Sequence, residues 1–252
     1  MDEFATFRRF GSLKQRKTKE CFYMQPELQT ANTGYASVAV APDSQKVLRN
    51  TYMLLALTMV PTVAGAWIGM QTAWIIQSSP FISFIVMMAA LVGLQFGIAA
   101  NRNSVVGIGL LLLMTGLMGW FIGPLLNHAL TVKNGAQLVG YAAGGTAAVF
   151  FGMATIATVT KRDFSFMGKF LFVGMIALLV AMLANMFLQI PALALTISSL
   201  VIVVFSLFLL HDISRIVTGG ETNYVMATTG VYISLLNIFV SLLQILTGGG
   251  RD

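Results

Sequence analysis

The sequence predicts an all-α membrane protein with seven transmembrane helices, and three observations indicate this class: composition, segment length and charge placement. Hydrophobic residues make up 57% of the chain and charged residues 10%, whereas a soluble domain carries about 25% charged residues. Seven apolar stretches without Asp, Glu, Lys or Arg follow residue 50, each close to the roughly 20 residues that a helix needs to cross a bilayer. Such segments are helices rather than barrel strands of about 10 residues, because backbone groups in lipid must pair within their own segment.

Short connections separate the seven spans and leave no room for a second domain. They range from one residue at Pro191 to roughly a dozen residues around Arg215. Pro80 and Pro191 stand just before or at helix starts, where a missing N–H has no cost. In chain order the expected spans are Thr51–Met70, Phe81–Ala100, Val105–Leu126, Ala136–Val159, Phe170–Ile190, Ala192–Leu210 and Tyr224–Thr247.

Small residues in the third and fourth spans indicate close helix packing. Gly119 and Gly123 lie four residues apart in the third span, and Gly140, Gly144 and Gly145 lie in the fourth. Glycine at this spacing lets two helix backbones touch. We expect these glycines to pack within the chain rather than to form a dimer.

The basic residues predict the orientation of the chain in the membrane. With the N-terminus in the cytoplasm, 13 of the 15 Lys and Arg fall on the inner side, and only Lys133 and Arg251 fall outside. Cytoplasmic loops carry such an excess of positive charge. An odd number of spans then places the C-terminus outside, on the periplasmic side. The net charge of +6 therefore reports topology and does not indicate binding of nucleic acid.

Two regions are expected: a flexible basic cytoplasmic tail, residues 1–49, and a seven-helix transmembrane bundle, residues 50–252. The tail holds eight Lys or Arg and five Asp or Glu. The single cysteine, Cys21, excludes an intramolecular disulfide. Met24 could serve as a start, which leaves open whether residues 1–23 are native. No cleavable signal peptide is expected, because the first span is itself the insertion signal.

The sequence contains none of the common catalytic motifs. HExxH, CxxC, GxSxG and the phosphate-binding GxxxxGK[ST] are all absent. His128 is expected in the outer loop after the third span and His211 at the cytoplasmic end of the sixth, so the two cannot share a metal ion. We therefore expect a protein without enzymatic activity, cofactor or metal.

Asp212 is the ionisable residue of greatest functional interest, because only His211 separates it from the apolar run of the sixth span. If Asp212 faces the bundle, burial disfavours its charged form and a pH switch becomes possible. If it lies in the headgroup zone, it pairs with Arg215 or Arg102. Both readings stay open at this point.

The connection before the seventh span has a flexible glycine pair, followed by Glu221 and a capping residue. An acid near a helix N-terminus complements the positive end of the helix dipole. Helix capping alone is enough to explain this segment.

The seventh span carries a stripe of polar side chains that is unusual in lipid. Intervals of three and four residues keep several of them on one face, and polar groups prefer protein or water to lipid. The stripe predicts a central seventh helix surrounded by the other six. It could line a path that passes or senses a cation, or it could join helices by hydrogen bonds. Its members are Thr228, Thr229, Tyr232, Ser234, Asn237, Ser241 and Gln244.

Six segments between Lys46 and the C-terminus carry a resemblance to a known family. They are Val47–Tyr52, Gly123–Asn127, Asp163–Phe166, Ala184–Leu193, Gly219–Tyr224 and Asn237–Leu243. With these segments the chain resembles the Bax inhibitor (transmembrane Bax inhibitor motif) family, most closely the bacterial branch typified by the modulator of the FtsH protease. Residues 1–45 show no such likeness.

The resemblance implies a seven-helix inner-membrane protein that binds the membrane-anchored AAA protease FtsH, in company with the HflK and HflC proteins. An ATP-driven unfoldase can grip an unstructured tail, but extraction of apolar spans from lipid is unfavourable. The chain would then act as a slowly extracted substrate that competes with others for the protease.

A second function, from a different class, is a pH-gated cation (calcium) leak. Other family members are described as leaks with two close aspartates, one ending the sixth helix and one in the seventh. Asp212 matches the first position, but the second falls on Ser234, which cannot share a proton or supply a second charge. Asn237 on the same helix is the remaining candidate for pH or ion sensing. The leak therefore stays the alternative.

Overall fold

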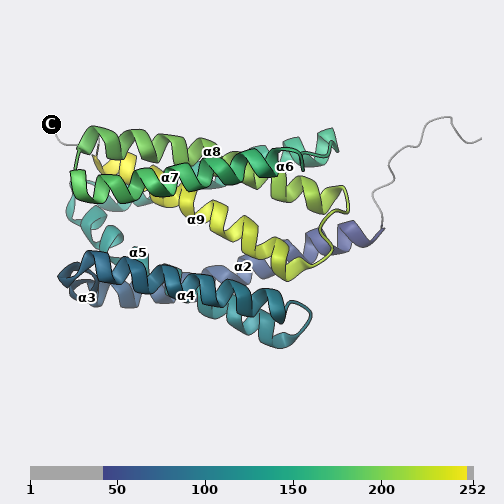
Figure 1. Ribbon diagram of the computed structural model, residues 1–252, viewed down its shortest axis with the longest axis horizontal. Helices are drawn as coiled ribbons and strands as arrows, with labels where there is room; N and C mark the ends of the chain where they lie inside the picture. Colours follow the sequence, from purple (N-terminus) through teal and green to yellow (C-terminus); the bar gives the residue numbers. More distant parts are fainter. Residues whose placement is uncertain (1–41, 249–252) are drawn as a thin grey trace, which may run out of the picture. The chain divides into compact units, whose positions relative to one another are not determined.

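A computed structural model describes residues 42–248 of the chain, and these residues form helices and connections without a strand (Figure 1). The predictions for most of the tail, including Cys21 and a start at Met24, fall outside the described residues. The helices are α2 (Pro42–Gln71), α3 (Ala73–Ser78), α4 (Pro80–Ala100), α5 (Val105–Thr131), α6 (Gly135–Thr160), α7 (Met167–Leu188), α8 (Pro191–Val217) and α9 (Tyr224–Gly248).

Seven of these helices are long and apolar enough to cross a membrane, which confirms the predicted fold class. Only the short helix α3 is not of this kind, and no helix was predicted there. Pro80 and Pro191 begin α4 and α8, where the sequence placed them.

Several helices extend beyond the predicted spans. The helix α2 begins at Pro42, inside the region predicted as tail, and α8 continues through Arg215 to Val217. The connection after α8 therefore holds only residues 218–223 rather than roughly a dozen. His128 lies inside α5 and not in a loop. Polar side chains remain helical at span ends because their long stems reach water while the backbone stays hydrogen-bonded.

The helix α9 runs between two groups of helices (Figure 1). On one side lie α2, α3, α4 and α5, and on the other lie α6, α7 and α8. The helix α9 contacts α2, α4, α5, α6 and α8, while α7 packs chiefly on α8. The arrangement of all six other spans around α9 stays a prediction.

The helices α2 and α5 pack with their backbones in direct contact, because glycines line their interface. An ideal Cβ atom at Gly119 would overlap the carbonyl oxygen of Thr62, and one at Gly123 would overlap the backbone of Gly69. Glycine is the residue that fits at both positions. The prediction that Gly119 and Gly123 pack within the chain is therefore confirmed.

The glycines of α6 behave differently, although their spacing is similar. An ideal Cβ at Gly145 would lie 3.1 Å from Cδ1 of Leu242 on α9, which is a close contact. Within residues 42–248, such a Cβ at Gly140 or Gly144 would meet no atom within 4 Å outside its own stretch of helix. The expectation of close packing within the chain is wrong for these two residues, because the face of α6 that carries them is exposed.

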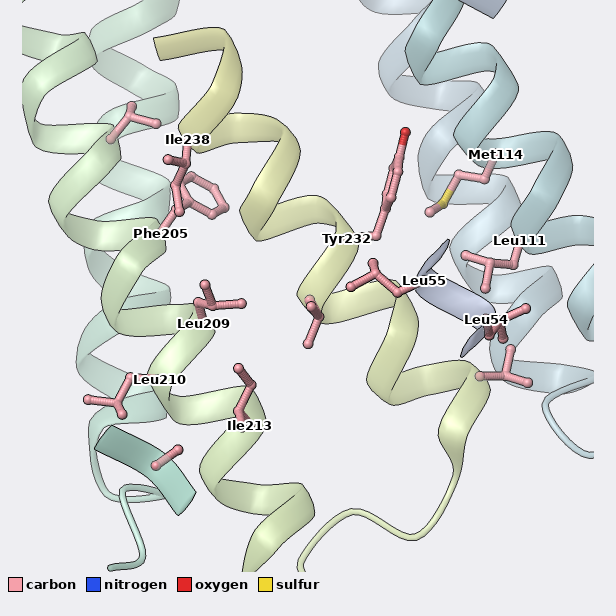
Figure 2. Close-up of a cluster of buried hydrophobic side chains, with 14 of the residues drawn as sticks. Leu54, Leu55, Leu111, Met114, Phe205, Leu209, Leu210, Ile213, Tyr232 and Ile238 are labelled. Atoms are coloured by element: carbon pink, nitrogen blue, oxygen red, sulfur yellow. The ribbon is translucent and has the colours of Figure 1, made fainter. Parts of the chain in front are cut away.

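Buried apolar side chains from all seven long helices of the described residues form one cluster, and Figure 2 shows members of it on both sides of α9. Large apolar side chains elsewhere on the spans, such as Phe96, Phe151 and Phe187, are exposed. Such exposure suits lipid-facing helices, because lipid tails are as apolar as these side chains. The buried cluster includes Leu54 and Leu55 of α2, Leu111 and Met114 of α5, Phe205, Leu209, Leu210 and Ile213 of α8, and Tyr232 and Ile238 of α9.

Candidate functional site

Asp212 lies near the end of α8, at a point where α7, α8 and α9 meet. Its Oδ1 atom is 3.1 Å from Nδ1 of His211, and its side chain is 20% exposed. An ideal Cβ at Gly230 of α9 would lie 2.6 Å from Oδ2 of Asp212. An ideal Cβ at Gly168 of α7 would lie 2.9 Å from Nε2 of His211. The histidine and aspartate therefore lie against glycines of two neighbouring helices.

Asp212 pairs with neither arginine that the sequence offered to it. Arg215 has its Nη2 atom 3.4 Å from Oε2 of Glu221. The connection after α8 folds back on the last helical turn, where the N–H of Glu221 donates to the carbonyl of Arg215 at 3.0 Å, and this brings the acid within reach. Arg102 is exposed and forms no ion pair within residues 42–248. The predicted pairing with Arg215 or Arg102 is therefore replaced by the contact with His211.

Ser234 and Asn237 lie on α9, but neither forms a hydrogen bond with Asp212 in the described structure. Ser234 follows Gly230 by four residues and so shares its helix face, and it is 2% exposed. Asn237 donates from Nδ2 to the carbonyl of Ile233 in its own helix at 2.8 Å. Within residues 42–248, no three His, Cys, Asp or Glu side chains lie close enough to hold a metal ion. The candidate sensing residues therefore do not form one hydrogen-bonded cluster.

Three members of the polar stripe join α9 to neighbouring helices, and the first, Thr228, donates to the carbonyl of Thr51 on α2 at 3.4 Å. The Tyr232 hydroxyl lies 2.7 Å from Oγ1 of Thr62 on α2 and 3.3 Å from the carbonyl oxygen of Thr115 on α5. Ser198 of α8 donates to Oε1 of Gln244 at 2.8 Å. These contacts favour the interpretation that the stripe joins helices.

A serine that sequence reasoning missed holds the α6–α7 connection to α8. Ser214 is fully buried. Its hydroxyl donates to the carbonyl of Arg162 at 2.7 Å and accepts the N–H of Phe164 at 3.2 Å. No local pattern indicates a contact between residues 50 and 52 positions apart.

Asn223 joins the start of α9 to the α4–α5 connection. Its Oδ1 accepts the N–H groups of Val225 and Met226 at 3.0 and 3.1 Å, which caps the first turn of the helix. Its Nδ2 donates to the carbonyl of Arg102 at 2.9 Å and to Oδ1 of Asn103 at 2.7 Å. The sequence predicted a capping residue before this helix, but it did not indicate the second set of bonds.

Asn223→Ala is expected to lower the free energy of unfolding by about 2 kcal/mol, because it removes a helix cap and the link between two connections. The measurement is unfolding of the purified chain in detergent by denaturant. Thr222→Ala is the matched control, because Thr222 is the exposed neighbour in the same connection. Equal stability of the two variants would contradict the role assigned to Asn223.

Comparison with known proteins identifies the family. Residues 44–252 match the family described as Inhibitor of apoptosis-promoting Bax1 (Bax1-I). The chain is 41% identical over 209 residues to the "Modulator of FtsH protease YccA" of Escherichia coli, covering 83% of this chain and 93% of that protein. In a second Escherichia coli strain, a protein with the same identity and coverage is called "Inner membrane protein YccA". A membrane protein of Vibrio cholerae is 42% identical over 204 residues, 81% of this chain and 90% of its own.

The family match extends over the whole described bundle. The matched residues 44–252 include all seven candidate spans, from Ser44 to Gly248. Family, hydropathy and helix arrangement therefore agree on a multi-pass membrane protein. This chain belongs to the Bax inhibitor family.

Proposed function

We propose that this chain is an inner-membrane regulator that binds the AAA protease FtsH and modulates the degradation of membrane proteins. The observation that carries the proposal is the 41% identity to the Escherichia coli protein called a modulator of FtsH protease. The relative called an inner membrane protein supports the location. HflK and HflC are proposed as further members of the complex. The distribution of Lys and Arg supports a cytoplasmic N-terminus and a periplasmic C-terminus.

In this proposal the chain is not an enzyme but a competing substrate that the protease extracts slowly. A protease that grips the tail would pull first on α2, the span that follows it. This helix packs backbone to backbone on α5, and its Thr62 contacts Tyr232 of α9. Each apolar span is also favourable to leave in lipid. The first pulling step therefore meets resistance from both the bilayer and the bundle.

Removal of the tail is expected to abolish most of the association with FtsH while leaving the bundle folded. A variant without residues 1–41 keeps the described part of α2, including the buried Ser44. The full chain is expected to co-purify with FtsH from native membranes and to be degraded slowly. Equal co-purification and turnover of the truncated chain would count against the regulator, provided that both chains unfold at the same temperature.

The alternative, a pH-gated cation leak, is supported by the position of Asp212 where three helices meet. Among the seven candidate spans of the described residues, Asp212 is the one Asp or Glu. Its carboxylate contacts His211. Calcium prefers six to eight oxygen ligands, and Ser234 supplies no second carboxylate here. The regulator is therefore the better-supported function.

We expect no pH-dependent calcium flux through the purified chain in liposomes, between mildly acidic and mildly basic pH. The measurement uses a calcium-sensitive dye trapped inside the liposomes, with protein-free liposomes as the control. Asp212→Asn is expected to behave like the parent chain. Flux through the parent that Asp212→Asn alters would instead support the leak.

A further inference from the structure

Cations and aromatic rings gather where the chain passes from α6 to α7. Lys161 and Arg162 directly follow α6, Lys169 lies in the first turn of α7, and all three are exposed. Phe166 and Phe170 are each 78% exposed in the same segment. We call these five residues the α6–α7 patch. The patch stands at the ends of two spans, so it lies at a membrane surface whichever way the chain is oriented.

Among the described residues, the three cations of the α6–α7 patch have no acidic partner. The ion pairs within residues 42–248 are those of His211 with Asp212 and of Arg215 with Glu221. Asp163 lies within the patch segment, but its Oδ1 accepts the N–H of Ser165 at 2.8 Å. Hydrogen bonds from the hydroxyl and the N–H of Ser165 hold the pKa of Asp163 below its ordinary value. With Asp163 ionised, three cations against one anion still leave the segment positive.

The segment that carries these charges is anchored to the bundle. The buried hydroxyl of Ser214 binds the carbonyl of Arg162 and the N–H of Phe164. These two bonds fix the backbone between Lys161 and Phe166 against α8. The cations therefore project from a positioned segment, so little of the backbone must be ordered when a ligand binds.

An exposed apolar stripe on α7 leads from the bilayer core to the patch. Val173, Ile176 and Val180 are 65%, 47% and 58% exposed. They follow Lys169 at intervals of three and four residues, so the four side chains share one side of the helix. Along this side of α7, the apolar side chains that face lipid are therefore followed, toward the membrane surface, by the ammonium group of Lys169. A phospholipid has the same order, with acyl chains followed by a phosphate.

We propose that the α6–α7 patch binds the headgroup of an anionic phospholipid whose acyl chains lie along the stripe of Val173, Ile176 and Val180. Lys and Arg next to a membrane attract anionic headgroups, and exposed Phe side chains are favourable at the boundary between headgroups and acyl chains. An acidic soluble protein could meet the cations but could not reach the stripe, which lies in the bilayer. The inference does not depend on binding to FtsH.

Native mass spectrometry of the full chain in detergent, with equal amounts of phosphatidylglycerol and phosphatidylcholine, tests the proposal. The parent chain is expected to retain phosphatidylglycerol preferentially. Combined substitution Lys161→Gln, Arg162→Gln and Lys169→Gln is expected to reduce this preference about 100-fold, since each cation contributes about fivefold. Lys133→Gln, in the α5–α6 connection, is the control and is expected to leave the preference unchanged. High salt is expected to weaken the preference of the parent.

Four outcomes would overturn the proposal. The first is equal retention of the two lipids by the parent, and the second is a preference that survives the triple substitution. The third is displacement of the lipid by inorganic phosphate, which would indicate a site for a free anion. The fourth is loss of a co-purifying protein in the triple variant with its lipid preference unchanged, which would assign the patch to a protein partner.

Two further controls separate the loss of charge from a folding defect: the unfolding temperature and a variant that keeps the charge. The three side chains are exposed and form no ion pair in the described structure, so their substitution is expected to leave the unfolding temperature unchanged. Lys169→Arg keeps the charge and is expected to keep the preference, whereas Lys169→Gln alone is expected to lose about fivefold. Equal preferences of these two single variants would contradict the role of Lys169.

Discussion

Gly123→Ala is expected to lower the free energy of unfolding of the bundle by about 3 kcal/mol or more. The added Cβ would overlap the backbone of Gly69 on α2, and a backbone cannot rotate away as a side chain can. The obstacle lies in the interface between α2 and α5, the most extensive helix pair of the bundle. Gly119→Ala would meet the carbonyl of Thr62 in the same way and is expected to have a similar cost.

Gly144→Ala is the matched control, because Gly144 also lies inside a span, but among the described residues an added Cβ would meet no atom within 4 Å outside its own stretch of helix. Alanine is favoured over glycine in a helix by up to about 1 kcal/mol, so this variant is expected to be as stable as the parent or slightly more stable. The measurement is the loss of helical circular dichroism as SDS is added to the purified chains. If Gly123→Ala and Gly144→Ala unfold at the same SDS concentration, α2 and α5 are not in backbone contact.

Tyr232→Ala is expected to destabilise the bundle by about 3–5 kcal/mol, the usual cost of removing a large buried aromatic side chain. The ring is 1% exposed, and it lies between α9 and Met114 of α5 (Figure 2). Tyr232→Phe keeps the ring and removes only the hydroxyl. Hydrogen bonds between membrane helices contribute about 0.6 kcal/mol on average and at most about 1.7, so this variant is expected to lose far less.

A double-mutant cycle between Tyr232→Phe and Thr62→Val measures the hydrogen-bonded part directly. The contact that the cycle tests is the 2.7 Å approach of the two hydroxyls, in which either group can donate. The expected coupling free energy is about 0.6–1.7 kcal/mol. A coupling free energy of zero would contradict the contact between the two hydroxyls. A Tyr232→Phe variant as unstable as Tyr232→Ala would contradict the claim that burial of the ring, rather than the hydroxyl, provides most of the stabilisation.

The spans could be predicted from the sequence because length and hydropathy are properties of the local composition. Their ends could not, since interfacial residues such as Arg215 are polar yet remain helical. The packing of the glycines shows the same limit of local information. Gly119 with Gly123 and Gly140 with Gly144 have the same spacing, but only the first pair faces another helix.

The sequence singles out Asp212 as a candidate residue but does not indicate its contacts. Asp212 stands out in the sequence because it follows an uncharged apolar run. Its approach to Gly230, and the bonds of Ser214 and Asn223 to distant connections, depend on how helices far apart in the chain meet. A periodic pattern tells which face of a helix is polar, but not which partner that face meets.

The rate at which FtsH degrades a membrane-protein substrate in proteoliposomes tests the central claim most directly. The proposed regulator predicts that the rate falls as more of the full chain is incorporated, while the chain itself is degraded slowly. The variant without residues 1–41 is predicted to slow the protease much less. A substrate degradation rate that stays constant at every ratio of chain to protease would contradict the regulator.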